Sequence, residues 1–248
     1  MLGIIGGSSL NRIADLESPQ RVSIGTPYGD ASAALTIGKL HGTELVFLAR
    51  HGDGHTIAPH RINYRANLWA LHARGVRNVV AVATVGGIRE DLIPGALLVP
   101  DQIIDYTHGR EGTFFDGISQ PLQHIDFTNP FGGRMRKDLL QAGVATGEHL
   151  LDGGIYGATQ GPRLESAAEV ERMARDGADV VGMTGMPEAA LARELELDYA
   201  MLCVVVNAAA GRGDNVNGVA IPEIAAVAEA AMKRVTRLLA GVARQHGR

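Results

Sequence analysis

The chain has 248 residues, of which 46% are hydrophobic and 20% charged, and its formal net charge is −4. This balance is typical of a globular protein with a large core and excludes a disordered chain. Because the basic residues are scattered, we expect no nucleic-acid partner and no membrane partner. The single cysteine, Cys203, excludes a disulfide framework. The opening Met1–Ile5 lacks a basic leader, so a cytoplasmic protein is expected.

Short apolar runs that end in glycine or polar turns alternate with segments of helical spacing. The predicted strands are Leu2–Ile5, Leu45–Leu48, Asn78–Ala83, Leu97–Ile104, Gly154–Ala158, Val180–Val181 and Tyr199–Val206. The predicted helices are Ile62–Arg74, Arg134–Ala145, Ser166–Asp176, Pro187–Glu196 and Pro222–Gln245. The alternation predicts an α/β fold.

The helix starts carry clear signals, and the chain shows no linker. Ser166 and Glu169 form a capping box, and Pro187 and Pro222 suit a first helical turn, where a missing N–H loses nothing. We find no Pro/Ser-rich linker, charge block or internal repeat, which favours one domain over residues 1–248. The least regular stretch is Asp105–Asn129.

The first motif is Gly3–Ser9, a strand that runs into two glycines and two hydroxyls. Exposed N–H groups in such a turn can surround an anion, although for this loop alone a plain tight turn is the favoured interpretation. The spacing lacks the G-x-G-x-x-G fingerprint, which argues against a nicotinamide dehydrogenase.

The second motif places Arg50 and His51 at the end of an apolar strand. A guanidinium beside an imidazole can clamp phosphate, but the pair can also be ordinary surface polarity. A metal site formed by His51, His55 and His60 is the third alternative, and it lacks acidic or thiol ligands nearby.

Further along the chain, several predicted strands end in polar or glycine-rich turns. A hydroxyl and two glycines follow the strand at Thr84, and the segments Gly161–Glu165 and Val181–Glu188 combine apolar with polar side chains, as small polar ligands require. Asn207 ends a strongly apolar strand and must find partners for its amide, as a ligand or as a turn former.

Taken in this order, the motifs resemble the trimeric purine nucleoside phosphorylase and methylthioadenosine phosphorylase family, over nearly the whole chain. They are Gly6-Gly-Ser8, Arg50-His51, His55–Pro59, Asn63–Asn67, His124-Ile, Pro130-Phe131, Gly161-Pro-Arg163, Met183-Thr184, Pro187-Glu188 and Asn207. The resemblance implies one α/β domain with a central mixed sheet flanked by helices. It also implies a homotrimer and inorganic phosphate as co-substrate, with no metal or other cofactor.

Carried over residue by residue, the resemblance assigns phosphate contacts and catalytic groups. The phosphate ligands implied are Ser8, Arg50, His51, Thr84 through its main chain, and Thr184. His51 and Asn207 are the implied catalytic residues, with Asn207 stabilising the departing purine as N7 gains a proton. Met183 is implied to lie against the ribose, and Leu164 stands where many relatives have a phenylalanine against the purine.

The base pocket indicates a 6-oxopurine. A carboxylate at Glu165 accepts from the N1–H of hypoxanthine but faces the N1 lone pair of adenine, and the Asn207 amide can donate to N7 or O6. Methylthioadenosine phosphorylases carry aspartates after this strand, where this chain has Asn207 and Ala209. Both Glu165 and Asn207 match the inosine and guanosine phosphorylases.

The region expected at the 5' end of the nucleoside is apolar. Ala220, Ile221 and Ile224 lie there, with His124 as a candidate contributed by a neighbouring subunit. An apolar lining favours a methylthio group over a hydroxyl, although these residues can also be the buried first turn of a helix. Together the pockets resemble the methylthioinosine phosphorylase branch, which implies phosphorolysis of S-methyl-5'-thioinosine.

Three alternatives stay open beside this interpretation. An inosine/guanosine phosphorylase or a methylthioadenosine phosphorylase would use the same phosphate chemistry on another nucleoside. A non-catalytic nucleoside-binding protein would keep the fold without turnover.

Overall fold

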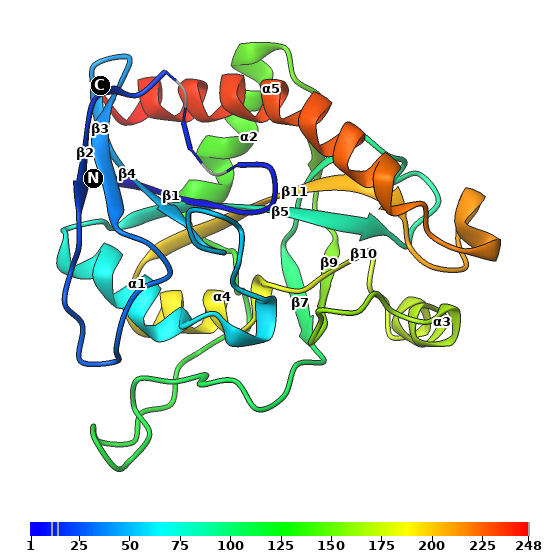
Figure 1. Cartoon of the computed structure of the whole chain (residues 1–248), viewed down its shortest axis with the longest axis horizontal. Coiled ribbons are helices and arrows are strands. Elements are labelled where there is room, and N and C mark those ends of the chain that lie inside the picture. Colours follow the sequence, from blue (N-terminus) through cyan, green and yellow to red (C-terminus); the bar gives the residue numbers. More distant parts are fainter. Residues whose placement is uncertain (11, 14, 248) are drawn as a thin grey trace.

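The computed structural model describes residues 1–10, 12–13 and 15–247. It confirms the predicted fold class, a single α/β domain with a central mixed sheet flanked by helices (Figure 1). The predicted domain range 1–248 includes Asn11, Ala14 and Arg248, which lie outside the described residues.

The strands and helices follow one another along the chain as the sequence alternation indicates. The strands are β1 (Leu2–Gly6), β2 (Glu17–Val22), β3 (Leu35–Leu40), β4 (Thr43–Ala49), β5 (Asn78–Gly87), β6 (Leu97–Val99), β7 (Gln102–Asp105), β8 (Leu151–Asp152), β9 (Ile155–Ala158), β10 (Val180–Gly182) and β11 (Asp198–Ala208). The helices are α1 (Tyr64–Ala73), α2 (Arg134–Thr146), α3 (Ala167–Arg175), α4 (Gly185–Glu194) and α5 (Ile221–His246), with short 3₁₀ turns η1 (Pro59–Arg61) and η2 (Gly213–Asn217).

Strand β5 is the centre of the sheet and changes partners along its length. Its first half pairs in parallel with β1, its last two residues pair antiparallel with β10, and β11 runs parallel to it throughout. Between these two pairings, residues 82–85 keep β11 as their one strand partner among the described residues. The sheet therefore splits beside β5, at the kind of switch point where α/β proteins bind ligands.

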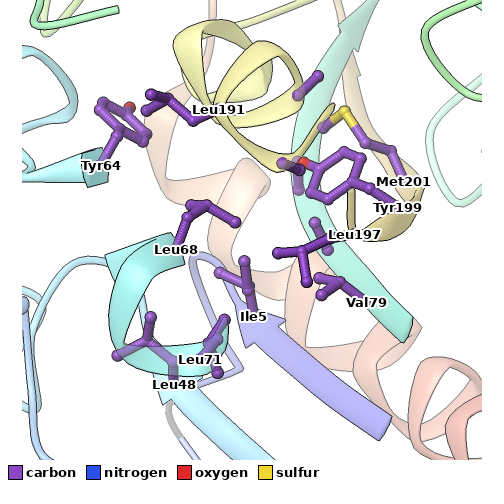
Figure 2. Packing of buried hydrophobic residues seen from close by; sticks show 14 of the residues in the cluster. Ile5, Leu48, Tyr64, Leu68, Leu71, Val79, Leu191, Leu197, Tyr199 and Met201 are labelled. Carbon is purple, nitrogen blue, oxygen red and sulfur yellow. The ribbon is translucent and has the colours of Figure 1, made fainter. Parts of the chain in front are cut away.

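Two apolar clusters hold the layers together, one on each face of the sheet. Helices α2 and α5 cover one face, and α1 and α4 cover the other (Figure 1). Figure 2 shows the cluster on the face covered by α1 and α4, where Leu68 and Leu71 of α1 and Leu191 of α4 pack against the strands. In the described part of the chain, no helix is long and apolar enough to cross a membrane.

The strands differ from the prediction in several places. Strands β2, β3 and β8 were not predicted. Strand β2 is an exposed edge strand of mostly polar residues that contains Pro19, and β8 has only two residues. The single strand predicted over Leu97–Ile104 is two strands, since β6 pairs with β11 and β8 whereas β7 pairs with β9. Strand β5 continues past Ala83 because β10 supplies a partner for Gly86 and Gly87.

The helix starts agree closely with their sequence signals. Ser166 caps α3, and the reciprocal capping box with Glu169 is present. Met186 has non-helical backbone angles inside α4, so the regular helix begins at Pro187, as predicted. Helix α5 also has its proline, Pro222, in the first turn.

Candidate active site

A cavity of about 160 Å³ opens where the sheet splits, at the carboxyl ends of β1, β4, β5, β10 and β11. It brings together most of the residues that the sequence analysis selected. Those that line it are Ser8, Arg50, His51, Thr84, Leu164, Glu165, Met183, Thr184, Asn207, Ala209 and Ile224.

Arg50 follows β4 directly and is fully buried, although it reaches the cavity wall. Its main-chain N–H donates to the carbonyl of Gly6 at 3.0 Å, which ties the ends of β4 and β1 together. A Cβ atom at Gly7 would lie 2.6 Å from the carbonyl oxygen of Val82 and 3.1 Å from Nη1 of Arg50. The turn after β1 therefore requires glycine to lie this close to β5 and to the guanidinium.

The guanidinium of Arg50 is held by an acidic partner that the sequence analysis gave no role. Nε and Nη2 donate to the two carboxylate oxygens of Glu188 at 2.6 and 2.8 Å, in a bidentate ion pair. Nη1 donates to the carbonyl of Val82 at 3.0 Å. Burial alone would lower the pKa of Arg50, but the charge of Glu188 and its hydrogen bonds outweigh that effect and raise it.

His51 is 7% exposed and lies against the same wall. Its Nδ1 is 2.8 Å from the carbonyl oxygen of Ile57, and because a carbonyl only accepts, Nδ1 carries the hydrogen. Burial and the neighbouring charge of Arg50 lower the pKa of His51 to about 4, against a weaker opposing effect of the Ile57 hydrogen bond. At neutral pH, His51 is therefore an uncharged imidazole with a lone pair on Nε2.

Hydroxyl groups complete this end of the cavity. Ser8 lies in the turn after β1, Thr84 in the split of β5, and Thr184 at the start of α4. The N–H of Thr184 donates to the buried hydroxyl of Tyr156 at 3.2 Å, which fixes the turn between β10 and α4. Hydroxyls and a guanidinium together form a chemistry suited to an oxyanion.

The other end of the cavity carries a carboxylate and an amide. The hydroxyl of Thr159 donates to Oε1 of Glu165 at 2.5 Å, which leaves Oε2 as an acceptor. Nδ2 of Asn207 donates to the carbonyl of Ala208 at 2.6 Å, so one of its two N–H groups is already used. Asn215 of η2 donates to the same carbonyl at 2.5 Å and links the following loop to Asn207.

A β-bulge in β11 aims Asn207 at the cavity. The pairing with β5 shifts register between Val205 and Asn207, so Val206 is an extra residue. As a result, Val206 and Asn207 both reach the cavity instead of pointing to opposite faces of the sheet. The sequence marks the strand and its final asparagine but not this bulge.

Three predicted residues lie apart from the cavity in the described part of the chain. Ala220 directly precedes α5 and is exposed. Ile221 is the first residue of α5, and its side chain is 68% exposed. Ile224, one turn later, reaches the lining instead. His124 is an exposed residue of the long irregular segment, and its assignment to a neighbouring subunit's cavity is not tested by a single chain.

Arg110 is a structural contact of the site that the sequence analysis missed. Its guanidinium donates to the carbonyls of Met183, Met186, Thr159 and Gln160 at 2.5–3.1 Å. It thereby ties the segment before Glu165 to the turn before α4. Arg110 lies in the stretch that looked least regular, where no periodic pattern gives a signal.

The residues described offer no cluster of three or more His, Cys, Asp or Glu side chains that could hold a metal. The rings of His51 and His55 lie near each other, with centroids 4.4 Å apart, but Nδ1 of His51 is committed to Ile57. The geometry therefore gives no support to the metal alternative for these histidines.

Comparison with known proteins matches residues 1–244 to the Phosphorylase superfamily. A probable S-methyl-5'-thioinosine phosphorylase from Xanthomonas campestris pv. campestris is 47% identical over 98% of this chain and 97% of its own length. The 6-oxopurine nucleoside phosphorylase of Pyrococcus furiosus is 44% identical over 85% of this chain and 80% of its own. The solved structure of methylthioadenosine phosphorylase from Schistosoma mansoni with adenine is 30% identical and has a TM-score of 0.93, covering 99% and 91% of the two chains.

Proposed function

The chain belongs to the Phosphorylase superfamily, and we propose that it cleaves S-methyl-5'-thioinosine with inorganic phosphate. The products are hypoxanthine and 5-methylthioribose 1-phosphate, a reaction of purine salvage. One observation carries the proposal: a single cavity joins an oxyanion-binding end around Arg50 to a base-binding end with Glu165 and Asn207. The full-length relative from Xanthomonas supports the same choice of nucleoside.

At the oxyanion end, the chain's residues hold phosphate below C1' of the ribose. Arg50, Ser8 and Thr184 donate hydrogen bonds, and the main chain at Thr84 adds another. Neutral His51 accepts from a protonated phosphate oxygen through Nε2, since its Nδ1 donates to Ile57. Positioning a nucleophile in this way contributes much of the rate, and no covalent enzyme intermediate is required.

In the reaction, a phosphate oxygen forms a bond to C1' while the bond from C1' to the purine N9 breaks. The purine leaves with the electron pair of that bond, and its N7 takes a proton from water. The second N–H of Asn207 stabilises the negative charge that develops on the purine. Met183 lies against the ribose, and Leu164 forms an apolar wall for the base.

The same end of the cavity selects 6-oxopurines. Thr159 fixes Oε1 of Glu165, and Oε2 accepts from the N1–H of hypoxanthine. Adenine presents a lone pair at N1, so the carboxylate stays unpaired. Because Glu165 is half-buried, we expect a penalty of about 10²–10⁴ rather than the roughly 10⁴–10⁵ of a fully buried site. Ile224 and Val219 give the lining an apolar portion that suits a methylthio group.

A 6-oxopurine nucleoside phosphorylase acting on inosine or guanosine is the second candidate. It shares Glu165 and Asn207, and the relative from Pyrococcus supports it. The methylthioadenosine phosphorylase alternative is supported by the similar fold of the Schistosoma structure. It conflicts with Glu165, because a carboxylate cannot donate a hydrogen bond to the N1 lone pair of adenine.

The deciding experiment measures purine release from S-methyl-5'-thioinosine, inosine and methylthioadenosine, with and without phosphate. Phosphate-dependent cleavage led by S-methyl-5'-thioinosine supports the proposal. A lead for inosine contradicts the apolar 5' pocket, and a lead for methylthioadenosine contradicts the role of Glu165. Absence of any cleavage favours a non-catalytic nucleoside-binding protein.

We further propose a homotrimer that needs only phosphate as co-substrate and works in the cytoplasm. The irregular segment that carries His124 exposes two large apolar side chains, Ile118 and Leu122, at 93% and 68%. A neighbouring subunit would cover such side chains and place His124 near the 5' end of the nucleoside. Light scattering of the purified protein tests this, and a monomer with full activity would contradict it.

A further inference from the structure

Two buried groups stand behind the oxyanion end of the cavity without contacting it. Glu188 lies in the first turn of α4, and Tyr199 is near the start of β11. Whereas Arg50 reaches the cavity lining, these two lie in the core behind it. Figure 2 shows Tyr199 in the apolar cluster beside Leu197 and Met201.

Arg50 and Glu188 form an ion pair from which water is excluded, since both side chains have 0% exposure. An unpaired buried charge is very costly, so Arg50 can occupy this position only because Glu188 compensates it. The geometry is a two-pronged fork, with Nε and Nη2 each donating to a different oxygen of Glu188. Such a fork fixes the plane of the guanidinium as well as its distance.

The fork also decides which donors are left for a ligand. A guanidinium has five N–H groups, and Glu188 and the carbonyl of Val82 take three of them. One N–H remains on Nη1 and one on Nη2. Nη1 lies beside the Gly7 turn, where a Cβ would approach it to 3.1 Å, so this edge faces the oxyanion end.

Tyr199 fixes the carboxylate in turn. Its hydroxyl donates to Oε1 of Glu188 at 2.8 Å, the same oxygen that accepts from Nη2 of Arg50. The ring stacks on Phe131, with centroids 6.1 Å apart, which restricts its rotation. A chain of contacts therefore runs from the core through Tyr199 and Glu188 to Arg50.

We infer that Glu188 and Tyr199 are positioning residues, which hold the Arg50 guanidinium in a fixed plane with two N–H groups ready for phosphate. The inference rests on the proposed function, because it assigns phosphate to this end of the cavity. Ordering a long arginine side chain normally opposes binding, but here the ordering is completed when the protein folds. Phosphate then binds to the two remaining N–H groups of Arg50, whose direction is already fixed. The pair of Arg50 and Glu188 carries no net charge.

The first test is Tyr199→Phe, which removes one hydroxyl outside the cavity. We expect the KM for phosphate to rise about 3–10-fold, the effect of losing one hydrogen bond of ordinary strength, with the KM for the nucleoside unchanged. Tyr106→Phe is the matched control, because it also removes a hydroxyl bonded to a carboxylate, Asp176, at 2.7 Å. The control should leave both KM values at the wild-type level.

The second test is Glu188→Gln alone and combined with Tyr199→Phe. A glutamine offers one acceptor atom instead of two, so we expect the phosphate KM to rise by about 30-fold or more. If Tyr199 acts through Glu188, the double variant should be no worse than Glu188→Gln, because coupled residues do not add. Should Glu188→Gln fail to fold, the phosphate KM of Tyr199→Phe, compared with that of Tyr106→Phe, tests the positioning role.

The outcomes separate this inference from the proposed function. An equal rise in both KM values, or a lower melting temperature with an unchanged phosphate KM, would mean a structural role only and overturn the inference. If the wild type binds phosphate in calorimetry but cleaves no nucleoside, the proposed function fails, and the phosphate Kd of the same variants still tests the positioning role. A wild type that binds no phosphate overturns both.

Discussion

The oxyanion end of the cavity is buried and held by several partners, whereas the purine end is half open to solvent. Arg50, His51 and Thr184 are at most 7% exposed and follow directly from strand ends. Leu164 at the other end is 40% exposed, and the loop beyond Asn207 exposes Val216 at 68%. The rigid end therefore suits the part of the reaction that every nucleoside shares, and the more open end suits the recognition of one nucleoside over another.

The largest expected effect comes from breaking the buried end with Arg50→Ala. The substitution removes the phosphate donors and leaves Glu188 as an unpaired buried charge, so we expect a loss of about 3–5 kcal/mol in unfolding free energy. Phosphate-dependent turnover should fall by more than about 100-fold, since a charged hydrogen-bonding group is lost. Denaturant unfolding and steady-state kinetics measure the two effects.

Arg175→Ala is the matched control, because its ion pair with Glu171 is exposed on α3. It should change the unfolding free energy by less than about 1 kcal/mol and leave turnover intact. If Arg50→Ala were equally mild, the buried end would not depend on this ion pair.

At the open end, Glu165→Gln should change selectivity more than stability. An amide can donate to the N1 lone pair of a 6-aminopurine, which the carboxylate cannot do. We expect the ratio of kcat/KM for 6-oxo over 6-amino nucleosides to fall by about 10²–10⁴. Glu171→Gln on the surface of α3 is the control, and an unchanged ratio in Glu165→Gln would contradict the assignment.

The acid side of the stability profile gives a third prediction, at the buried end. The pKa of His51 is lowered to about 4, so between pH 6.5 and 4 the unfolded chain binds a proton that the folded chain excludes. The unfolding free energy should therefore decrease as the pH falls through this window, by up to about 3 kcal/mol from His51. It is unaffected by His51 above pH 6.5, where both states are neutral.

Urea unfolding of the wild type and of His51→Gln at several pH values tests this. The variant should be less sensitive to acid between pH 6.5 and 4, although other groups still titrate. Parallel profiles for the two proteins would show that His51 is not protected from protonation in the fold.

The smallest effect is expected from Thr159→Val, which removes only the hydroxyl that fixes Oε1 of Glu165. The 6-oxo preference should fall by about 5–10-fold, the effect of losing one hydrogen bond of ordinary strength. Phosphate KM should stay constant, since Thr159 is at the purine end. A change confined to phosphate KM would contradict the division of the cavity.

The sequence predicted the parts of the site that lie at strand ends and missed those that depend on distant partners. Arg50 and Thr184 follow apolar strands and Asn207 lies near the end of one, and that local pattern marked these segments as candidates. The family resemblance then supplied their roles. The partnership of Arg50 with Glu188 joins positions 138 residues apart, and nothing in either segment indicates it. Arg110 was missed for the same reason, because its partners are main-chain carbonyls brought close only by the fold.

The fold shows the same division. Repeating apolar runs predicted the central strands and five helices, while the partner change along β5 could not be inferred from its own residues. The edge strand β2 has no buried face that would give an alternating pattern. Its existence depends on its pairing with β3.

The bulge at Val206 has an evolutionary consequence. Removing one residue there would restore simple alternation in β11 and turn Asn207 away from the cavity. Substitutions at Ala209 or Ile224 change only the shape of the lining, so they offer a gradual route to new nucleosides. We therefore expect the length of β11 to be inherited more strictly than the side chains around it, and laboratory evolution of this enzyme to succeed through replacements and fail through deletions in this strand.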